Sequence, residues 1–131
     1  GAGRGDAQLT ILLVDDNVDA AESLSMLLEL IGHKVWTAHT AGDALTIVES
    51  EQIDAFILDI GLPDMNGYDL IKALHRRPDI AAKPCFALTG YAQPQDQQLS
   101  IAAGFTQHFV KPVNSQLLFT ALAEVKAGAR S

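Results

Sequence analysis

The chain reads LTILLVDD from Leu9 to Asp16 and AFILD from Ala55 to Asp59. Short apolar runs of this kind are typical of buried parallel strands, so both runs predict strands that end in aspartates. In open α/β sheets, ligands bind in the crevice at those strand ends. Carboxylates gathered there repel one another unless they are protonated or bind a cation, and a hard divalent metal suits oxygen ligands. The two stretches therefore predict a small acidic metal pocket formed by Asp15, Asp16 and Asp59.

The composition is typical of one globular domain. The chain has 131 residues, of which 48% are hydrophobic and 19% charged, and this is enough to bury a full core. A net charge of -7 without a basic patch argues against binding to nucleic acid. The single cysteine, Cys85, lies in an apolar stretch and is expected to be a buried core thiol.

The sequence also suggests where the domain begins and ends. Residues 1–8 are interpreted as a linker or an expression remnant, residues 9–126 as the domain, and residues 127–131 as a fraying tail. The lone cysteine and the lack of a signal peptide or a membrane-length apolar run favour a cytoplasmic location without membrane insertion.

Strand-like and helix-like segments alternate five times along the chain. The expected strands span roughly residues 9–14, 34–38, 55–58, 84–89 and 109–110. Such alternation predicts a doubly wound α/β domain, in which a parallel sheet carries helices on both faces.

Five helices are expected between and after these strands. Asn17, Thr40 and Asn114 are suited to cap the first, second and last helices, and the other two cover about residues 68–76 and 95–103. Apolar residues at helical spacing predict the buried sides of the capped helices. They are Ala21, Leu24, Leu28 and Ile31 in the first, Ala44, Ile47 and Val48 in the second, and Leu118, Ala121, Leu122 and Val125 in the last.

Four of the five strands end in polar side chains that could act together. A carboxylate such as Asp59 can accept a phosphoryl group as an acyl phosphate, which makes it the candidate nucleophile. A divalent cation and the Lys111 ammonium would neutralise the phosphoryl oxygens, and the Thr89 hydroxyl would donate a hydrogen bond. Because Mg²⁺ keeps several waters, Asp16 and Asp59 could bind it directly and Asp15 partly through water.

Four motifs in this order resemble the receiver domain of two-component response regulators. They are LVDDN at residues 13–17, ILDIGLP at 57–63, ALTG at 87–90 and VKP at 110–112. The resemblance extends from about Leu9 to Val125, and the stretch from Ala103 to Val113 is most similar to receivers attached to hybrid sensor histidine kinases. It implies a flavodoxin-like (βα)5 fold with strand order 2-1-3-4-5.

The resemblance also implies how the site works. It implies an Mg²⁺ or Mn²⁺ site with these ligands: Asp15, Asp16, Asp59 and the Gly61 carbonyl. Asp59 would receive the phosphoryl group from the phosphohistidine of a sensor histidine kinase and pass it on to a histidine phosphotransfer domain or trigger a conformational switch. Thr89 would be the switch hydroxyl, and Lys111 would contact the phosphate and precede Pro112 through a cis peptide bond. The domain would be a signalling phosphoacceptor, with self-catalysed phosphorylation and dephosphorylation, rather than an enzyme.

His108 departs from the pattern of this family. Receivers usually carry Tyr or Phe three residues before the lysine, and this ring turns inward when the threonine moves toward the phosphate. A histidine is titratable and less apolar, so whether His108 acts as the switch residue stays open. Three other histidines, His33, His39 and His75, lack metal-ligand spacing and are expected at the surface.

Three other functions fit these residues less well. An aspartyl-nucleophile, metal-dependent phosphohydrolase would carry Asp-x-Asp-x-Thr after the first strand, whereas residues 15–19 read DDNVD. A flavin-binding module of the same architecture would need a phosphate loop rich in hydroxyls and glycine. A docking scaffold without phosphoacceptor activity would be expected to lose one of the five pocket residues, and none is missing. Whether the receiver is free-standing or excised from a hybrid kinase stays open, with the second favoured.

Overall fold

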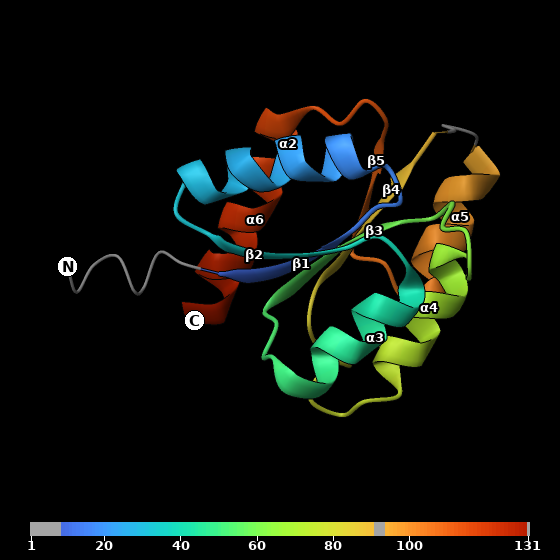
Figure 1. Cartoon of the computed structure of the whole chain (residues 1–131). Coiled ribbons are helices and arrows are strands. Elements are labelled where there is room, and N and C mark those ends of the chain that lie inside the picture. Colours follow the sequence, from blue (N-terminus) through green and yellow to red (C-terminus); the bar gives the residue numbers. More distant parts are fainter. Residues whose placement is uncertain (1–8, 91–93, 131) are drawn as a thin grey trace.

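The computed structural model describes residues 9–90 and 94–130 and forms three layers, with a parallel sheet between two layers of helices (Figure 1). The five strands lie in the order β2-β1-β3-β4-β5. This confirms the predicted flavodoxin-like class and its strand order. The expected linker at residues 1–8 lies outside the described residues.

Every predicted strand and helix is present. Their bounds are β1 Thr10–Val14, α2 Val18–Leu30, β2 Lys34–Ala38, α3 Ala41–Ser50, β3 Ala55–Asp59, α4 Gly67–His75, β4 Cys85–Thr89, α5 Pro94–Ala103, β5 Gln107–Val110 and α6 Ser115–Arg130. The helical backbone of α6 continues to Arg130, into the residues expected to form a tail.

The sheet has a hydrophobic core on each face. Leu12 and Val14 of β1 pack with the helices α3 and α4, whereas Ile11 and Leu13 pack with α2 and α6. Figure 1 shows the same division, with α2 and α6 on one side of the sheet and α3, α4 and α5 on the other. Because both faces are covered, β1, β3 and β4 read as continuous apolar runs rather than as alternating patterns.

The predicted helix caps are confirmed. Asn17 Oδ1 accepts a hydrogen bond from the Ala20 amide at 3.0 Å, and Thr40 Oγ1 accepts one from Asp43 at 3.1 Å. Asn114 Oδ1 accepts hydrogen bonds from the amides at the start of α6. These caps satisfy amide groups that have no partner within the helix, so they fix where each strand-to-helix loop ends.

Ile31 corrects one prediction about the first helix. Ala21, Leu24 and Leu28 are buried as expected, but Ile31 is 44% exposed. It is the residue at which α2 ends, and Gly32 then turns the chain with a φ of 103°. The helical spacing that would bury residue 31 therefore stops just before it.

The burial of Cys85 was predicted correctly, whereas that of three histidines was not. Cys85 is buried as expected, and burial raises the pKa of its thiol to about 12. The surface expectation for His33, His39 and His75 is wrong, because all three are half-buried. His33 Nδ1 accepts a hydrogen bond from the Leu9 amide, for example, at 3.2 Å. Among the described residues, none of the helices is long and apolar enough to cross a membrane.

Candidate functional site

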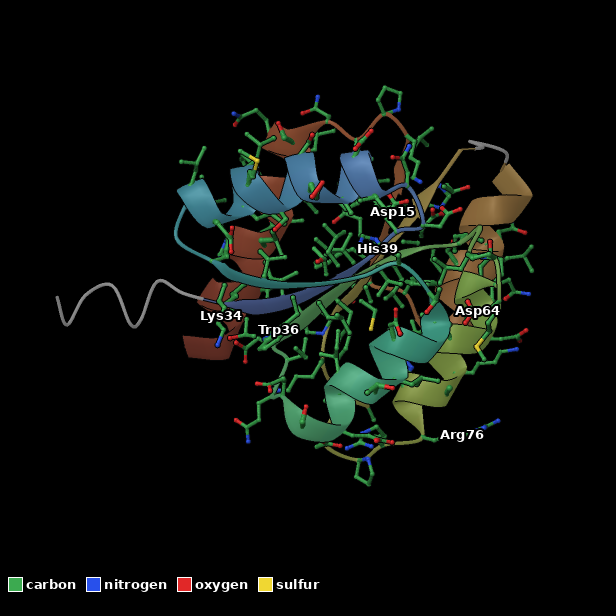
Figure 2. The ribbon with its side chains drawn as sticks, in the orientation of Figure 1. Asp15, Lys34, Trp36, His39, Asp64 and Arg76 are labelled. Atoms are coloured by element: carbon green, nitrogen blue, oxygen red, sulfur yellow. The ribbon has the colours of Figure 1, made fainter. Side chains whose placement is uncertain are left out.

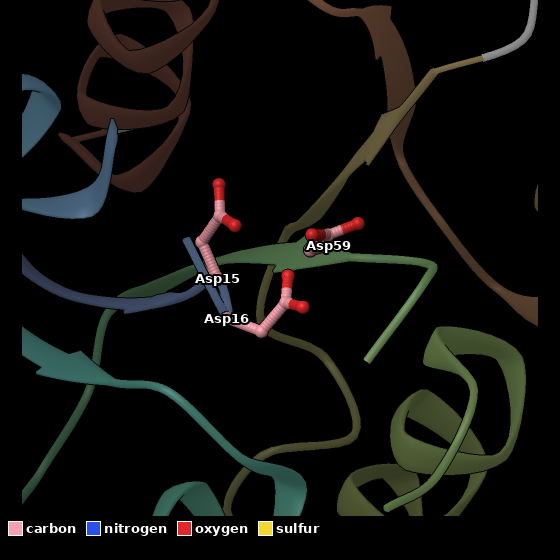
Figure 3. Close-up of side chains that lie close together, drawn as sticks. All are labelled: Asp15, Asp16 and Asp59. Carbon is pink, nitrogen blue, oxygen red and sulfur yellow. The ribbon is translucent and has the colours of Figure 1, made fainter. Parts of the chain in front are cut away.

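Three aspartates meet where β1 and β3 end (Figure 3). Asp15 and Asp16 follow β1, Asp59 ends β3, and one carboxylate oxygen from each lies within 4.8 Å of the other two. The pairing of Val14 with Leu58 brings the two strand ends level, which explains why residues far apart in sequence converge. Asp15 and Asp59 are buried, whereas Asp16 is exposed. The predicted juxtaposition of the three carboxylates is confirmed.

Backbone amides orient the two buried carboxylates. Asp15 Oδ1 accepts a hydrogen bond from the Asn17 amide at 3.0 Å, and Asp59 Oδ1 accepts one from the Gly61 amide at 2.9 Å. Each carboxylate is therefore held by the loop that follows its own strand. Gly61 lies in the β3–α4 loop directly beside Asp59, as a metal ligand from that loop would require.

Lys111 brings a positive charge to the same site. Its Nζ lies 2.8 Å from Asp59 Oδ2 and 3.3 Å from Asp15 Oδ2, and its amide donates to the Thr89 carbonyl at 2.7 Å. The peptide bond between Lys111 and Pro112 is cis, as the resemblance implied. Thr89 ends β4 and is 8% exposed, so it belongs to the same edge of the sheet.

The environment gives the two buried carboxylates different proton affinities. Burial is the largest influence on both and disfavours their charged forms. The pKa of Asp15 is raised, because burial outweighs the Asn17 amide and the charge of Lys111. The pKa of Asp59 is lowered, because the hydrogen bonds from Lys111 and Gly61 together outweigh burial. Burial also lowers the pKa of Lys111, but its contacts with Asp59 and Asp15 outweigh this and the net shift is upward.

The donor set fits a hard divalent cation. All three side chains offer carboxylate oxygens, and the single ammonium of Lys111 leaves two negative charges unmatched among these four residues. Oxygen ligands and excess negative charge are what Mg²⁺ requires, since it binds through a few carboxylates and keeps several waters. With such a cation bound, the cation and Lys111 would together offset the negative charge of a phosphoryl group at this site.

His108 lies outside this pocket. It is half-buried on β5, where it pairs with Ala87 of β4, and its Nδ1 lies 3.3 Å from the hydroxyl of Ser100 on α5. Its Nε2 is buried and has no hydrogen-bond partner among the described residues. Sequence reasoning singled out His108 but missed the buried Ser100, which is an ordinary polar residue in a glutamine-rich helix.

Two residues next to the pocket were also missed. His39 Nδ1 donates a hydrogen bond to the main-chain carbonyl of Asp15 at 2.9 Å, and Asp64 accepts from two amides of α3. His39 directly precedes the predicted cap Thr40, and Asp64 lies in a loop of turn-forming residues. Nothing in the sequence around His39 or Asp64 indicates that either side chain contacts another loop.

An apolar groove adjoins the pocket on the side of α2. It lies between α2 and the connection from β5 to α6 and is lined by Leu24, Leu27, Pro112 and Val113, with Lys111 and Asp15 at its edge. Leu27 is 42% exposed there. The strand ends that carry Asp15 and Lys111 therefore border an apolar surface.

Comparisons with known proteins agree on one family. The family model described as the response regulator receiver domain matches residues 11–123. The chain is 37% identical over 119 residues to the sensor histidine kinase AruS of Pseudomonas aeruginosa, with coverage of 89% of this chain and 12% of AruS. It is 30% identical over 118 residues to the protein PilH of the same species, with coverage of 90% and 98%.

A solved structure gives the same result. The chemotaxis response regulator CheY4 of Vibrio cholerae superposes with a TM-score of 0.84 at 30% sequence identity, with coverage of 90% of this chain and 98% of CheY4. The matches thus include a protein of similar length and a short part of a much larger kinase. They favour the receiver interpretation over the phosphohydrolase alternative.

Proposed function

Because this chain belongs to the family of response regulator receiver domains, we propose that it accepts a phosphoryl group on Asp59 from the phosphohistidine of a sensor histidine kinase. Receiver domains are signalling phosphoacceptors that pair with such kinases. The assignment to Asp59 is carried by its contact with Lys111, whose Nζ lies 2.8 Å from Asp59 Oδ2. This contact lowers the pKa of Asp59 against the effect of burial and keeps it ionised, as a nucleophile must be.

The remaining pocket residues would assist this transfer. As the P–N bond of the donor breaks, a bond forms between phosphorus and a carboxylate oxygen of Asp59. The lysine ammonium, Lys111, would offset negative charge on the phosphoryl oxygens. Thr89, at the neighbouring strand end, would donate its hydroxyl to the phosphoryl group and serve as the switch residue. By the same chemistry, the domain would catalyse its own phosphorylation from small donors and its own dephosphorylation.

A resident Mg²⁺ or Mn²⁺ would supply further charge neutralisation. Its ligands would be Asp15, Asp16, Asp59 and the Gly61 carbonyl, with Asp15 acting partly through water. The unmatched negative charge of the pocket supports this assignment. The acidic residues would hold the ion next to the oxygens of the phosphoryl group that Asp59 accepts.

The partners follow from the proposed reaction. A sensor histidine kinase would supply the phosphoryl group, and a histidine phosphotransfer domain would receive it. The likeness to AruS supports a module of a hybrid kinase, although PilH shows that the family also includes proteins of this length. We favour the hybrid-kinase module, in the cytoplasm, where the kinase donor would act.

Phosphorylation of the purified domain with acetyl phosphate tests the assignment. In the presence of Mg²⁺, intact-mass spectrometry should detect the addition of one phosphoryl group. Asp59→Asn and, separately, EDTA should each abolish this addition, because one removes the acceptor and the other removes the cation that offsets phosphoryl charge.

Asp54→Asn provides a matched control. Asp54 follows α3 at the opposite end of the sheet, where its carboxylate accepts a hydrogen bond from the Thr10 amide at 2.8 Å. This variant should be phosphorylated like the native domain. An unchanged mass shift in Asp59→Asn would show that the acceptor has been misassigned.

A further inference from the structure

The turn between β2 and α3 contacts both loops that carry the acidic pocket. In Figure 2, Asp15, His39 and Asp64 lie toward the same end of the molecule. His39 Nδ1 donates to the main-chain carbonyl of Asp15 at 2.9 Å. On the other side of the turn, Asp64 Oδ1 accepts from the Ala41 amide at 2.9 Å and Oδ2 accepts from the Gly42 amide at 3.0 Å. The turn therefore bridges the β1–α2 loop and the β3–α4 loop.

The β3–α4 loop, residues 60–66, is held at three places. At its base, the Gly67 amide donates to the Ile60 carbonyl at 2.8 Å, and a Cβ at Gly67 would lie only 2.7 Å from Ile60 Cα. Leu62 is buried in the core on the α3 side of the sheet. The third place is Asp64, whose carboxylate accepts two hydrogen bonds from amides of α3 and so ties the exposed part of the loop to a second element.

The first turn of α3 suits a carboxylate at this point. The amides of Ala41 and Gly42 have no acceptor within the helix, and the helix dipole favours a negative charge there. These two hydrogen bonds lower the pKa of Asp64. Thr40 accepts the next amide of the same turn, from Asp43, at 3.1 Å, but belongs to the β2–α3 turn itself. The cap of α3 is thus shared between a local residue and one from the pocket loop.

We propose that Asp64 is a positioning residue for the acidic pocket. Its carboxylate clamps the 60–66 loop onto α3 and so fixes Gly61, which lies two residues after Asp59 and whose carbonyl would be a ligand of the metal. The role in metal binding rests on the proposed function, because it assumes that the pocket binds Mg²⁺. Asp64 itself stays outside the set of ligands.

Two variants of Asp64 and one control variant test this role. Asp64→Ala removes both hydrogen bonds, Asp64→Asn removes the same charge but keeps one acceptor oxygen, and Thr40→Ala weakens the same helix end without touching the loop. Titration with Mg²⁺ should show affinity reduced roughly threefold to tenfold in Asp64→Ala, less than the roughly 10–100-fold loss typical of residues that hydrogen-bond a metal ligand directly, because Asp64 acts through the loop. Asp64→Asn should fall between native and Asp64→Ala, and Thr40→Ala should bind like the native protein.

Amide hydrogen exchange without metal gives a second measurement of the clamp. In Asp64→Ala, the Gly61 and Gly67 amides should exchange faster than in the native protein, whereas in Thr40→Ala only the amides of the first turn of α3 should do so. Equal Mg²⁺ affinity in native and Asp64→Ala, or equal losses in Asp64→Ala and Thr40→Ala, would overturn the positioning role. If the native protein did not bind Mg²⁺, the assignment of the metal site would be wrong. Separately, equal exchange of the Gly61 amide in Asp64→Ala and in the native protein would rule out the clamp.

Discussion

At the scale of single residues, Asp15 and Asp59 are chemically identical side chains with opposite pKa shifts. Both are buried at neighbouring strand ends. Asp59 has the shorter contact with Lys111, at 2.8 Å against 3.3 Å for Asp15. The pKa of Asp59 is therefore lowered, whereas burial raises the pKa of Asp15. This difference leaves Asp59, the proposed nucleophile, ionised and Asp15 with a charge that is costly until a cation binds.

Asp15→Asn should therefore stabilise the metal-free protein at neutral pH, by about 1 kcal/mol, which lies within the range of single stabilising substitutions. The pKa of Asp15 is higher in the folded protein than the reference value of 3.8, so Asp15 ionises first in the unfolded chain. The free energy of unfolding of the native protein therefore falls as pH rises from that value. The advantage of Asn should be absent below that pH and should grow above it. Urea unfolding across the pH range measures this difference.

Added Mg²⁺ should reduce the stability advantage of Asp15→Asn over the native protein. A ligand that binds only the folded state raises the free energy of unfolding, and Asp15→Asn should gain less from it than the native protein. Asp19→Asn, at an exposed position in the first turn of α2, is the matched control for a charge lost nearby. A metal-free Asp15→Asn protein less stable than the native one at neutral pH would contradict the burial argument.

At the scale of elements, the contact between α5 and β5 connects the pocket to a distant surface. Ser100 of α5 is buried, and its hydroxyl lies 3.3 Å from His108 Nδ1. His108 is three residues from Lys111, on the strand that pairs with Thr89. A displacement of Thr89 toward a phosphoryl group would reach α5 through this region. One imidazole nitrogen is buried and has no hydrogen-bond partner within residues 9–90 and 94–130, so burial of the imidazole is less favourable than that of an aromatic ring.

His108→Tyr should increase the response of α5 and β5 to phosphorylation. A ligand shifts two states only by the difference in free energy between them, and burial of a larger apolar ring would stabilise the active state further. Amide chemical shifts of Leu99 to Ala103 and Gln107 to Val110, with and without a beryllofluoride mimic, measure the response. Ser100→Ala serves as the control that keeps the imidazole. Responses of equal size in the native protein and His108→Tyr would refute this reasoning.

At the scale of the whole molecule, the reactive edge is open toward one of the two helical faces. The groove between α2 and the β5–α6 connection borders Lys111 and Asp15. On the other face of the sheet, Ile101 of α5 is an apolar residue that is 70% exposed. In the proposed transfer, a phosphohistidine must come within bonding distance of Asp59. The protein that carries this phosphohistidine should therefore dock on the α2 face rather than on α5.

Leu27→Asp should slow phosphoryl transfer from a histidine phosphotransfer domain about tenfold, equivalent to about 1.4 kcal/mol, because it places a charge in the apolar groove. Labelling by acetyl phosphate should be unchanged, since a small donor needs no docking surface. Ile101→Asp is the matched control and should transfer at the native rate. Equal slowing with both donors would point to damage in the pocket instead of lost docking.

The fold class, the five strands and helices and the acidic pocket could be predicted from the order of the amino acids alone. Apolar runs that end in Asp15, Asp16 and Asp59 indicate buried strand ends, because a sheet covered on both faces requires continuous apolar strands. Capping residues such as Asn17 and Thr40 act within their own loops, and local chemistry was enough to identify them. The role of the Gly61 carbonyl came from the resemblance alone, whereas the roles of Thr89 and Lys111 also follow from their positions at strand ends, and all three are predictions to be tested.

The contacts between loops and the pKa shifts of the buried carboxylates could not be predicted in this way, because they depend on how the elements pack. His39 was expected at the surface, yet it binds the Asp15 backbone, and Asp64 resembled a turn former, yet it caps a helix from another part of the chain. Both contacts join residues that are more than 20 positions apart, 24 for the first and 23 and 22 for the second. Sequence periodicity reports the side of an element that is buried, whereas contacts between loops depend on how neighbouring strands align in the sheet. The opposite pKa shifts of Asp15 and Asp59 also depend on the tertiary structure, because burial, Lys111 and the loop amides act on the two carboxylates to different extents.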